Sequence, residues 1–314
     1  MNTISAHQTN TGGVNITIVT HNRKELTEKT ILSLVRDIKN IQYIITVVDN
    51  ASSDGTYQLL QNLHERKVIH NFILFKRNMG AAVACNFGWS LVDADFYMRL
   101  DNDILFNECG AVEKMAHHLS ENPEIGIMSC ECFHGIDKYI PANTSSGTTL
   151  LRHKCDEITA GGCVLIRKDT FSKLGYWCED YGSYGPEDAD YSMRCDKLGL
   201  KRYYLPNLDA IKHIGTQENE SDEYKCKKIS MQKHHFDVSH GMLAVNRILY
   251  EYGLRNLYME RKYVPHIESN YVTFSTSNEY VKRMQILKKA TLKILEDRRM
   301  YIEYLQLEKK NEQQ

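Results

Sequence analysis

The feature that most constrains the fold is the alternation of short apolar runs with helical patterns between residues 14 and 100. Four runs are short and rich in β-branched or aromatic residues, which predicts strands over 14–20, 43–48, 72–75 and 96–100. Apolar residues at helical spacing separate them, which predicts helices over 25–37, 57–64 and 81–91. This alternation predicts an α/β domain with a mainly parallel central sheet.

Polar residues follow the ends of these strands. Thr20, Asp49, Arg77 and Asp101 each end a predicted strand or follow one closely. Ligands of open α/β sheets bind in the crevice outside the carboxyl ends of the strands. We therefore expect these four residues, which are far apart in the sequence, to line one crevice.

The acidic triplet Asp101-Asn102-Asp103 is the most informative spot in that set. It follows directly after the apolar strand 96–100. Two carboxylates separated by one residue provide hard oxygen ligands for a divalent cation, which commonly shares its remaining ligand positions with substrate phosphates. The alternative is a turn at the end of a strand with solvated carboxylates.

The pattern continues with less regularity after the triplet. We expect a helix over 113–119, a strand over 125–130, and a polar surface loop or hairpin over 133–156. A strand over 157–166 is interrupted by Gly161 and Gly162, a feature that often marks close approach of a ligand or another backbone. A helix is expected over 188–198.

The composition changes after residue 216, where a charged linker over 218–223 precedes a largely helical region. Residues 282–310 fit an amphipathic helix, which would pack on the main domain or join a second copy or partner. We therefore expect a disordered tail over 1–13, a main domain over 14–216, and a helical C-terminal extension over 217–314 that binds the acceptor or mediates oligomerisation.

Charge and cysteine content limit the class of protein. The formal net charge is −1, so no global field favours nucleic acid or a membrane surface. No apolar run approaches the roughly 18 residues of a membrane span, and the polar first thirteen residues do not read as a signal peptide. Nine cysteines without paired CxxC spacing favour reduced thiols. We expect a cytoplasmic protein, with a peripheral position at the inner membrane face left open.

The motifs occur in a distinctive order along residues 14–216. They are Val19-Thr20-His21-Asn22-Arg23, Asp49-Asn50-Ala51-Ser52-Ser53-Asp54-Gly55-Thr56, Arg77-Asn78-Met79-Gly80, Asp101-Asn102-Asp103, Gly185-Pro186-Glu187-Asp188-Ala189-Asp190 and Lys212-His213. As an ordered set they resemble the family 2 glycosyltransferases of the GT-A fold. The resemblance implies a Rossmann-like domain that transfers a sugar from a nucleotide sugar, with inversion and with metal dependence.

The resemblance also implies roles for the acidic motifs. Asp101 and Asp103 form the DXD motif and would hold Mn²⁺ or Mg²⁺, with His213 completing the metal shell. Asp188 matches the general base that takes the proton of the acceptor hydroxyl, and Glu187 would orient either the acceptor or the base. The alternatives are that His213 is an ordinary histidine near a strand end, and that Asp188 caps a helix.

The donor and acceptor sites follow from the same resemblance. Donor contacts are expected from Thr20, Asn22, Arg23, Asp49, Arg77, Gly80, Asp101, Asn102 and Gly162. Asp49 would pair with the base or ribose of the nucleotide. Trp177 and Tyr184 would bind the acceptor sugar, although aromatic residues that pack under a loop are an equally good interpretation.

Several other groups carry weaker signals. Asp93-Ala94-Asp95 repeats the carboxylate spacing but precedes its strand, and therefore falls at the wrong end of the sheet. Asp54-Gly55 reads as a turn, and Asp190 reads as a residue that serves the fold. A histidine cluster at 234, 235 and 240 reads as solvated or capping side chains rather than a metal site.

We therefore predict a hexosyltransferase-like enzyme that acts in polysaccharide or other glycan biosynthesis. It would move one sugar from a UDP- or dTDP-sugar to a hydroxyl of a glycan, a lipid-linked glycan or a protein. Processive synthases of this fold carry a Gln-x-x-Arg-Trp signature, which neither Trp89 nor Trp177 provides. The alternatives are a nucleotidyltransferase, disfavoured by the absence of a glycine-rich loop after residue 20, and a catalytically silent scaffold or binding subunit.

Overall fold

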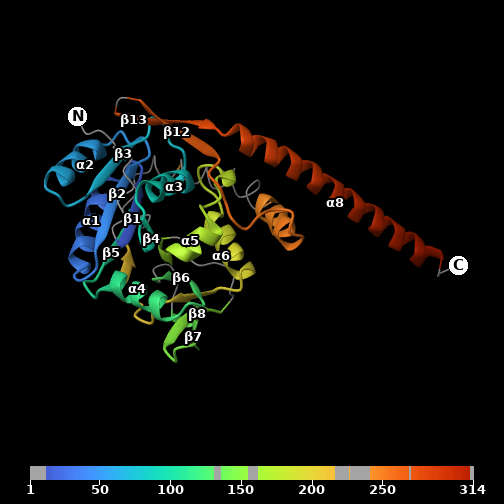
Figure 1. The fold of residues 1–314 in the computed structure, drawn as a ribbon, viewed down its shortest axis with the longest axis horizontal. Coiled ribbons are helices and arrows are strands. Elements are labelled where there is room, and N and C mark those ends of the chain that lie inside the picture. The colour runs from blue at the N-terminus through green and yellow to red at the C-terminus, as the bar shows by residue number, and fades with distance from the viewer. Residues whose placement is uncertain are drawn as a thin grey trace.

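A nine-stranded sheet forms the centre of the computed structural model, which describes residues 12–130, 136–154, 162–215, 226, 241–268 and 270–311 (Figure 1). The order across the sheet is β3-β2-β1-β4-β9-β6-β10-β8-β7. The bounds are β1 (Val14–Thr20), β2 (Tyr43–Asp49), β3 (Asn71–Leu74), β4 (Phe96–Asp101), β6 (Ile125–Ser129), β7 (Tyr139–Asn143), β8 (Thr149–His153), β9 (Cys163–Arg167) and β10 (Lys201–Tyr204).

The predicted mainly parallel sheet is confirmed, with one insertion that the sequence pattern did not reveal. β1 pairs in parallel with both β2 and β4, and β3 and β10 also lie in parallel pairs. The register places Thr20 opposite Asp49, and Val19 opposite Asp101, so three strands end at the same level. β9 runs antiparallel between β4 and β6. β7 and β8 form a hairpin, one of the two alternatives expected for residues 133–156.

Helices cover both faces of the sheet and give three layers (Figure 1). One face packs on α1 (Lys24–Asp37), α2 (Thr56–Glu65) and α4 (Ala111–Glu121). The other packs on α3 (Ala81–Leu91), α5 (Lys168–Leu174) and α6 (Glu187–Lys197).

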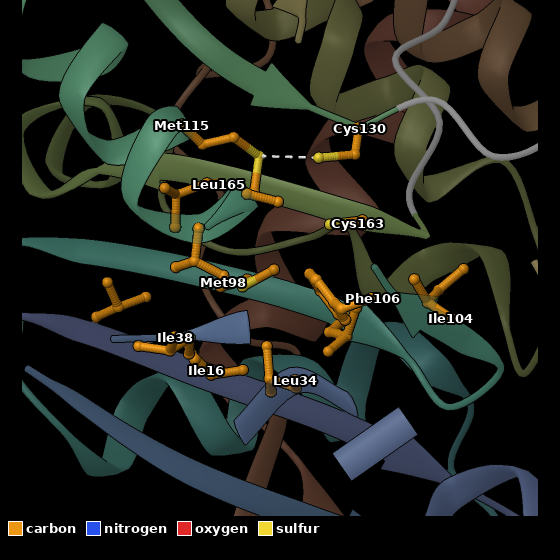
Figure 2. Close-up of a cluster of buried hydrophobic side chains, with 14 of the residues drawn as sticks. Ile16, Leu34, Ile38, Met98, Ile104, Phe106, Met115, Cys130, Cys163 and Leu165 are labelled. Carbon is orange, nitrogen blue, oxygen red and sulfur yellow. Dashed lines mark hydrogen bonds between the residues drawn. The ribbon is translucent and has the colours of Figure 1, made fainter. Parts of the chain in front are cut away.

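The core on the α1 side is built mainly from buried aliphatic side chains, with a few aromatic and sulfur-containing ones among them (Figure 2). Ile16 from β1, Leu34 from α1 and Met98 from β4 meet there. Tyr97, the neighbour of Met98, points to the opposite face and packs in the cluster that contains Trp89. This alternation follows from the period of two along a strand, and burial on both faces explains the nearly continuous apolar runs.

The C-terminal extension contains a β-hairpin that the largely helical expectation missed. β12 (Tyr263–Glu268) and β13 (Tyr271–Thr276) pair antiparallel, and Val272 forms a bridge with Phe75 just after β3. Val272 is buried in the same cluster as Phe75 and Phe87. The hairpin therefore extends the hydrophobic core at the β3 edge of the sheet.

The last helix, α8 (Asn278–Asn311), extends away from the remainder of the chain (Figure 1). Its presence confirms the helix predicted over 282–310. The predicted linker and the histidine cluster fall outside the described residues, as do the tail up to residue 11 and Gly161. Within the described ranges, no helix combines the length and hydrophobicity that crossing a bilayer requires.

Candidate active site

The acidic triplet lies between the end of β4 and a short strand, β5 (Ile104–Phe106). Asp101 donates its backbone N–H to the carbonyl of Gly162 at 2.8 Å, because β9 begins beside the end of β4. Gly162 therefore contributes its backbone to the position of Asp101. This is close backbone approach, which glycine in a strand often marks.

The triplet and His213 are brought together by a second, two-stranded sheet. β5 pairs antiparallel with β11 (Ile211–His213), which places His213 opposite Ile104. Asp103 directly precedes Ile104, and its Oδ2 lies 3.2 Å from Nε2 of His213. Two residues that the family resemblance assigns to one metal are thus neighbours in the folded chain.

Arg23 occupies the same carboxylate oxygen of Asp103. Its Nη1 donates to Oδ2 at 2.5 Å, and the two side chains are only 11% and 7% exposed. Burial raises the pKa of Asp103, but the hydrogen bonds and charges of His213 and Arg23 outweigh it and hold the pKa below its usual value. A Cβ atom on Gly215 would collide with Oδ2 of Asp103, so a larger residue there would displace the Asp103 side chain. Asp103 is therefore ionised at neutral pH.

Asp101 lies in a different electrostatic environment. Its side chain is 39% exposed, and its Oδ1 is 3.9 Å from Nε of Arg99. Desolvation, together with the charges of Asp103 and Glu187, raises the pKa of Asp101 to about 6, although Arg99 and Arg23 act in the opposite direction. A bound cation would favour the ionised form of such a carboxylate.

The donor set suits a divalent metal in its chemistry. Carboxylates from Asp101 and Asp103 with the imidazole of His213 are ligands that Mn²⁺ accepts, and Mg²⁺ prefers the oxygens. Among the described residues, however, no three His, Cys, Asp or Glu side chains converge as a ready metal-binding group. Arg23 is paired with Oδ2 of Asp103 in this structure. The residues therefore fit a metal once Arg23 has moved.

The expected base lies at the start of α6. Asp188 is the second residue of this helix, and its Oδ1 accepts the backbone N–H of Ala189 at 2.8 Å. The cap position belongs to Pro186, which makes no side-chain capping bond. Desolvation and the charge of Glu187 raise the pKa of Asp188 to about 6, with Arg99 acting against them. A carboxyl with a raised pKa is suited to accept a proton near neutral pH.

Glu187 and Asp190 face different partners. Glu187 is buried, and its Oε1 accepts from Nη2 of Arg99 at 3.0 Å. Asp190 is fully buried and pairs with Arg194 at 2.7 Å, while its other oxygen accepts from the hydroxyls of Tyr181 and Tyr250. Asp190 therefore serves the fold, as expected, and ties α6 to the helical residues 241–251.

Two residues that were expected to contact the sugar donor are instead hydrogen-bonded within the protein. Thr20 and Asn102 are buried, and Nδ2 of Asn102 donates to Oγ1 of Thr20 at 3.0 Å. Oγ1 of Thr27 on α1 lies 2.7 Å from the same hydroxyl and also accepts from Asn102 at 3.3 Å. This network fixes the acidic triplet to β1 and α1, so these two side chains position the site.

The expected nucleotide contacts at the ends of β1 and β2 are held by turn interactions. Oδ1 of Asp49 accepts the N–H of Ser52 at 3.0 Å, and desolvation raises the pKa of Asp49. Asn22 has a positive φ of 54° and accepts the N–H of Ser53 at 2.7 Å through its side chain. The turns after the two strands are therefore linked, and Asp49 is held at the expected edge of the sheet.

Gly80 joins this edge to the loop before α6. It has a φ of 89°, and a Cβ atom there would lie 2.5 Å from Cα of Ser183. Both the backbone conformation and the close approach require glycine. Arg77 is exposed, with its Nε 3.2 Å from the sulfur of Met79, and it lies on the same loop.

The aromatic residues before α6 separate into two groups. Trp177 is 1% exposed and packs on Trp89 and Tyr191, so its ring belongs to the core. Tyr181 is also buried, whereas Tyr184 is 48% exposed. The structure thus favours packing over acceptor contact for Trp177, because its ring is not accessible to a ligand. Of these three rings, Tyr184 alone is exposed enough to meet a sugar.

The weaker acidic signals behave as expected. Asp93 lies before β4, at the opposite end of the strand from the triplet, and pairs with Lys168 at 2.7 Å. Asp54 accepts the backbone N–H groups of Lys24 and Thr56, which makes it a turn and cap residue.

Arg99 lies between residues of the candidate site and was missed by the sequence analysis. It contacts both Asp101 and Glu187, and so joins the triplet to the start of α6. One signal was present: Arg99 is the only charged residue in the apolar run 96–100. A charge in a buried strand requires a partner, which could have directed attention to an acidic group elsewhere.

Comparison with known proteins identifies the family. The family model described as glycosyl transferase family 2 matches residues 15–174, slightly more than half of the chain. The chain belongs to glycosyl transferase family 2. Family membership makes glycosyl transfer the activity to propose for this chain, as the motifs implied. The match includes the acidic triplet but ends before Glu187, Asp188 and His213. Comparison with curated protein sequences finds no match.

Solved structures show the same fold. The mannosyltransferase PcManGT from Pyrobaculum calidifontis, in complex with GDP-Man and Mn²⁺, has a TM-score of 0.56 at 17% identity, over 74% of this chain and 64% of that one. GalNAc-T7 with UDP, GalNAc and Mn²⁺ has a TM-score of 0.54 at 15% identity, over 67% and 45%. TarS of S. aureus has a TM-score of 0.53 at 16% identity, over 66% and 37%. The chain thus matches less than two thirds of each protein's length, and the GT-A fold is what they share.

Proposed function

We propose that this glycosyltransferase carries out metal-dependent, inverting transfer of a hexose-type sugar. The donor would be a UDP- or dTDP-sugar, and the acceptor a hydroxyl on a glycan, a lipid-linked glycan or a protein. The observation that carries the proposal is the position of Arg99, within 3.9 Å of Asp101 and 3.0 Å of Glu187. The leaving-group side and the base side of the proposed site therefore lie against one guanidinium group, although their residues are far apart in sequence.

The proposed metal site comprises Asp101, Asp103 and His213 and would bind Mn²⁺ or Mg²⁺. A bound metal would neutralise the negative charge that develops on the departing nucleoside diphosphate. The presence of Mn²⁺ in the PcManGT and GalNAc-T7 complexes supports a divalent metal in this fold. The low pKa of Asp103 supports an ionised ligand at neutral pH.

Asp188 would act as the general base. Its carboxylate would take the proton of the acceptor hydroxyl while that oxygen attacks the anomeric carbon opposite the diphosphate, which inverts the configuration. A raised pKa, about 6, supports this role because the group is ionised at neutral pH yet remains basic. Glu187 would orient Asp188, and exposed Tyr184 would meet the acceptor sugar.

Donor binding is proposed along the carboxyl ends of β1, β2 and β3. Asp49 would pair with the base or ribose, and Arg23 and Arg77 would contact the diphosphate. Asn22 and the backbone at Gly80 would shape the surface between them. The linked turns at Asn22 and Asp49 support a preformed nucleotide-binding edge.

The division into a catalytic domain over 14–216 and an extension over 217–314 remains part of the proposal. Acceptor binding or oligomerisation through the last helix is the proposed role of the extension. Exposed apolar side chains on α8, such as Ile286 at 67% and Leu292 at 57%, support oligomerisation. A cytoplasmic location is also proposed, supported by the free, buried thiols among the described cysteines.

Two variants test the assignment of roles. UDP, dTDP and GDP would each be titrated calorimetrically with and without Mn²⁺, and transfer would be followed by release of the nucleoside diphosphate. Asp103→Ala should lose both metal-dependent nucleotide binding and turnover. Asp188→Asn should retain nucleotide binding but lose transfer by about 10²-fold or more, as expected when a general base is removed.

The control is Asp93→Asn, which removes a carboxylate at the opposite end of β4 and should transfer at the wild-type rate. Wild-type transfer by Asp188→Asn would show that the base is another residue. A wild-type protein that binds no nucleotide in the presence of metal would instead be a silent scaffold.

A further inference from the structure

Arg99 is a buried cation in the middle of the central sheet. It lies on β4 between Thr17 of β1 and Val164 of β9 and is 7% exposed. A buried charge is costly unless it is paired and hydrogen-bonded. Both neighbouring strands present uncharged residues at this level, so the partners of Arg99 are not its neighbours across the sheet.

The partners of Arg99 are a carboxylate on the proposed base side, a carboxylate on the proposed metal side, and a ring of the hydrophobic core. Nη2 donates to Oε1 of Glu187 at 3.0 Å, and Nε lies 3.9 Å from Oδ1 of Asp101. The guanidinium carbon is 4.8 Å from the centre of the Trp177 ring. Stacking on a buried indole restricts the plane of the guanidinium, and the plane decides which carboxylates it can reach.

We propose that Arg99 is a positioning residue that holds Glu187, and with it the first turn of α6, at a fixed place relative to the acidic triplet. The inference rests on the proposed role of Asp188 as the base, because Asp188 directly follows Glu187 in that turn. Arg99 itself need not touch either substrate.

On the side of α6 that faces the sheet, the described residues offer its first turn few other polar contacts. Its cap residue, Pro186, makes no side-chain capping bond. Three acidic residues, Glu187, Asp188 and Asp190, crowd its first turn, and Asp190 is directed to Arg194 and Tyr250 on the other side. The Arg99–Glu187 pair is therefore the contact that anchors this turn to the sheet beside Asp101.

The same helix provides a matched control. At the far end of α6, Asp196 accepts two hydrogen bonds at 2.8 Å from Arg202, which lies on β10 of the same sheet. Both pairs join α6 to a strand through an arginine, but Arg202 holds the end remote from Asp188. A purely structural role for such a pair predicts similar outcomes for the two arginines, whereas a positioning role does not.

The test compares Arg99→Gln, Arg99→Lys and Arg202→Gln with the wild type. Binding of UDP with Mn²⁺ is measured by calorimetry, and kcat and donor KM by nucleoside diphosphate release during transfer. Arg99→Gln should lower kcat at least about tenfold with UDP affinity and donor KM within about threefold, since misplacement of a catalytic group by about 1 Å can cost 10²-fold. Arg99→Lys should recover part of the loss, and Arg202→Gln should keep the wild-type kcat.

The double variant Arg99→Gln/Glu187→Gln covers the case in which Arg99→Gln does not fold, because it leaves no lone charge in the core. It should also lose at least about tenfold in kcat at unchanged UDP affinity, and should be no worse than Arg99→Gln where both fold. Wild-type kcat in either variant, or an equal loss in Arg202→Gln, would overturn the inference.

Asp188→Asn separates this result from the proposed function. If Asp188→Asn loses transfer while the Arg99 variants keep it, the positioning role of Arg99 alone is wrong. If Asp188→Asn transfers normally, the assignment of the base is wrong, and the proposed positioning role of Arg99 is wrong as well.

Discussion

Replacement of Arg23 by methionine should strengthen the binding of free metal, because it removes the cation that is paired with Asp103. In the structure Arg23 and His213 both contact Oδ2 of Asp103, at 2.5 Å and 3.2 Å. A metal that binds this oxygen must displace Arg23. The arginine would therefore compete with a metal for this oxygen.

The size of the effect follows from the contact that must be broken. A hydrogen bond to a charged group contributes about 1.5–3 kcal/mol net, and these two side chains are almost fully buried. Arg23→Met removes this cost from metal binding. Because about 1.4 kcal/mol corresponds to a tenfold change, the Kd for Mn²⁺ without nucleotide should fall by about 10- to 100-fold.

Calorimetric titration of Mn²⁺ into the nucleotide-free protein measures this change directly. Arg36→Met is the control, since Arg36 lies on α1, the helix that Arg23 directly precedes, but forms an exposed pair with Glu108. In the presence of metal, the affinity of Arg23→Met for UDP should instead fall, because its proposed diphosphate contact is lost. An unchanged or weaker Kd for Mn²⁺ in nucleotide-free Arg23→Met would refute the competition.

Three further predictions follow from other contacts. The kcat of transfer should rise with pH through about 6 and then level off, because protonated Asp188 cannot accept a proton; a flat pH–rate profile between about pH 5 and 8 would contradict this. Gly80→Ala should lower the free energy of unfolding by about 1–3 kcal/mol, because its positive φ and the backbone of Ser183 leave no room for Cβ. Denaturant unfolding measures this loss, and an unchanged midpoint would show that the loop can rearrange to accept the methyl group. Tyr250→Phe should cost about 1–2 kcal/mol in the same assay by removing the bond to Asp190, whereas no loss would mean that the extension does not stabilise α6.

The first half of the fold was predictable because its strands are buried on both faces. Strands such as β1 and β2 read as continuous β-branched runs, and the helices between them show clear periodicity. β9 was expected as a strand, but its antiparallel place between β4 and β6 depends on pairing between segments distant in sequence. The β12–β13 hairpin was missed because most of β12 is exposed, so it lacks a strong apolar signal.

The parts of the candidate site that were predictable are those in which the functional residues are close together in the sequence. The acidic triplet carries its spacing and its strand within a few residues, so the position of Asp101 and Asp103 could be expected. The partners of these carboxylates could not be predicted, because they come from distant parts of the sequence. Arg23 is 80 residues from Asp103, and Arg99 is 88 residues from Glu187. Local sequence also does not distinguish a buried ring from an exposed one, which is why Trp177 and Tyr184 were grouped together.

The central claim is that carboxylates of the triplet hold a metal that serves a nucleotide sugar. Its most direct measurement is nucleoside diphosphate release from a panel of UDP-, dTDP- and GDP-sugars, with wild type and Asp103→Ala, in Mn²⁺ and in a chelator. We predict release from a UDP- or dTDP-sugar that the chelator abolishes, Mn²⁺ restores and Asp103→Ala lacks. Equal release by Asp103→Ala, or release that persists in the chelator, would contradict the account.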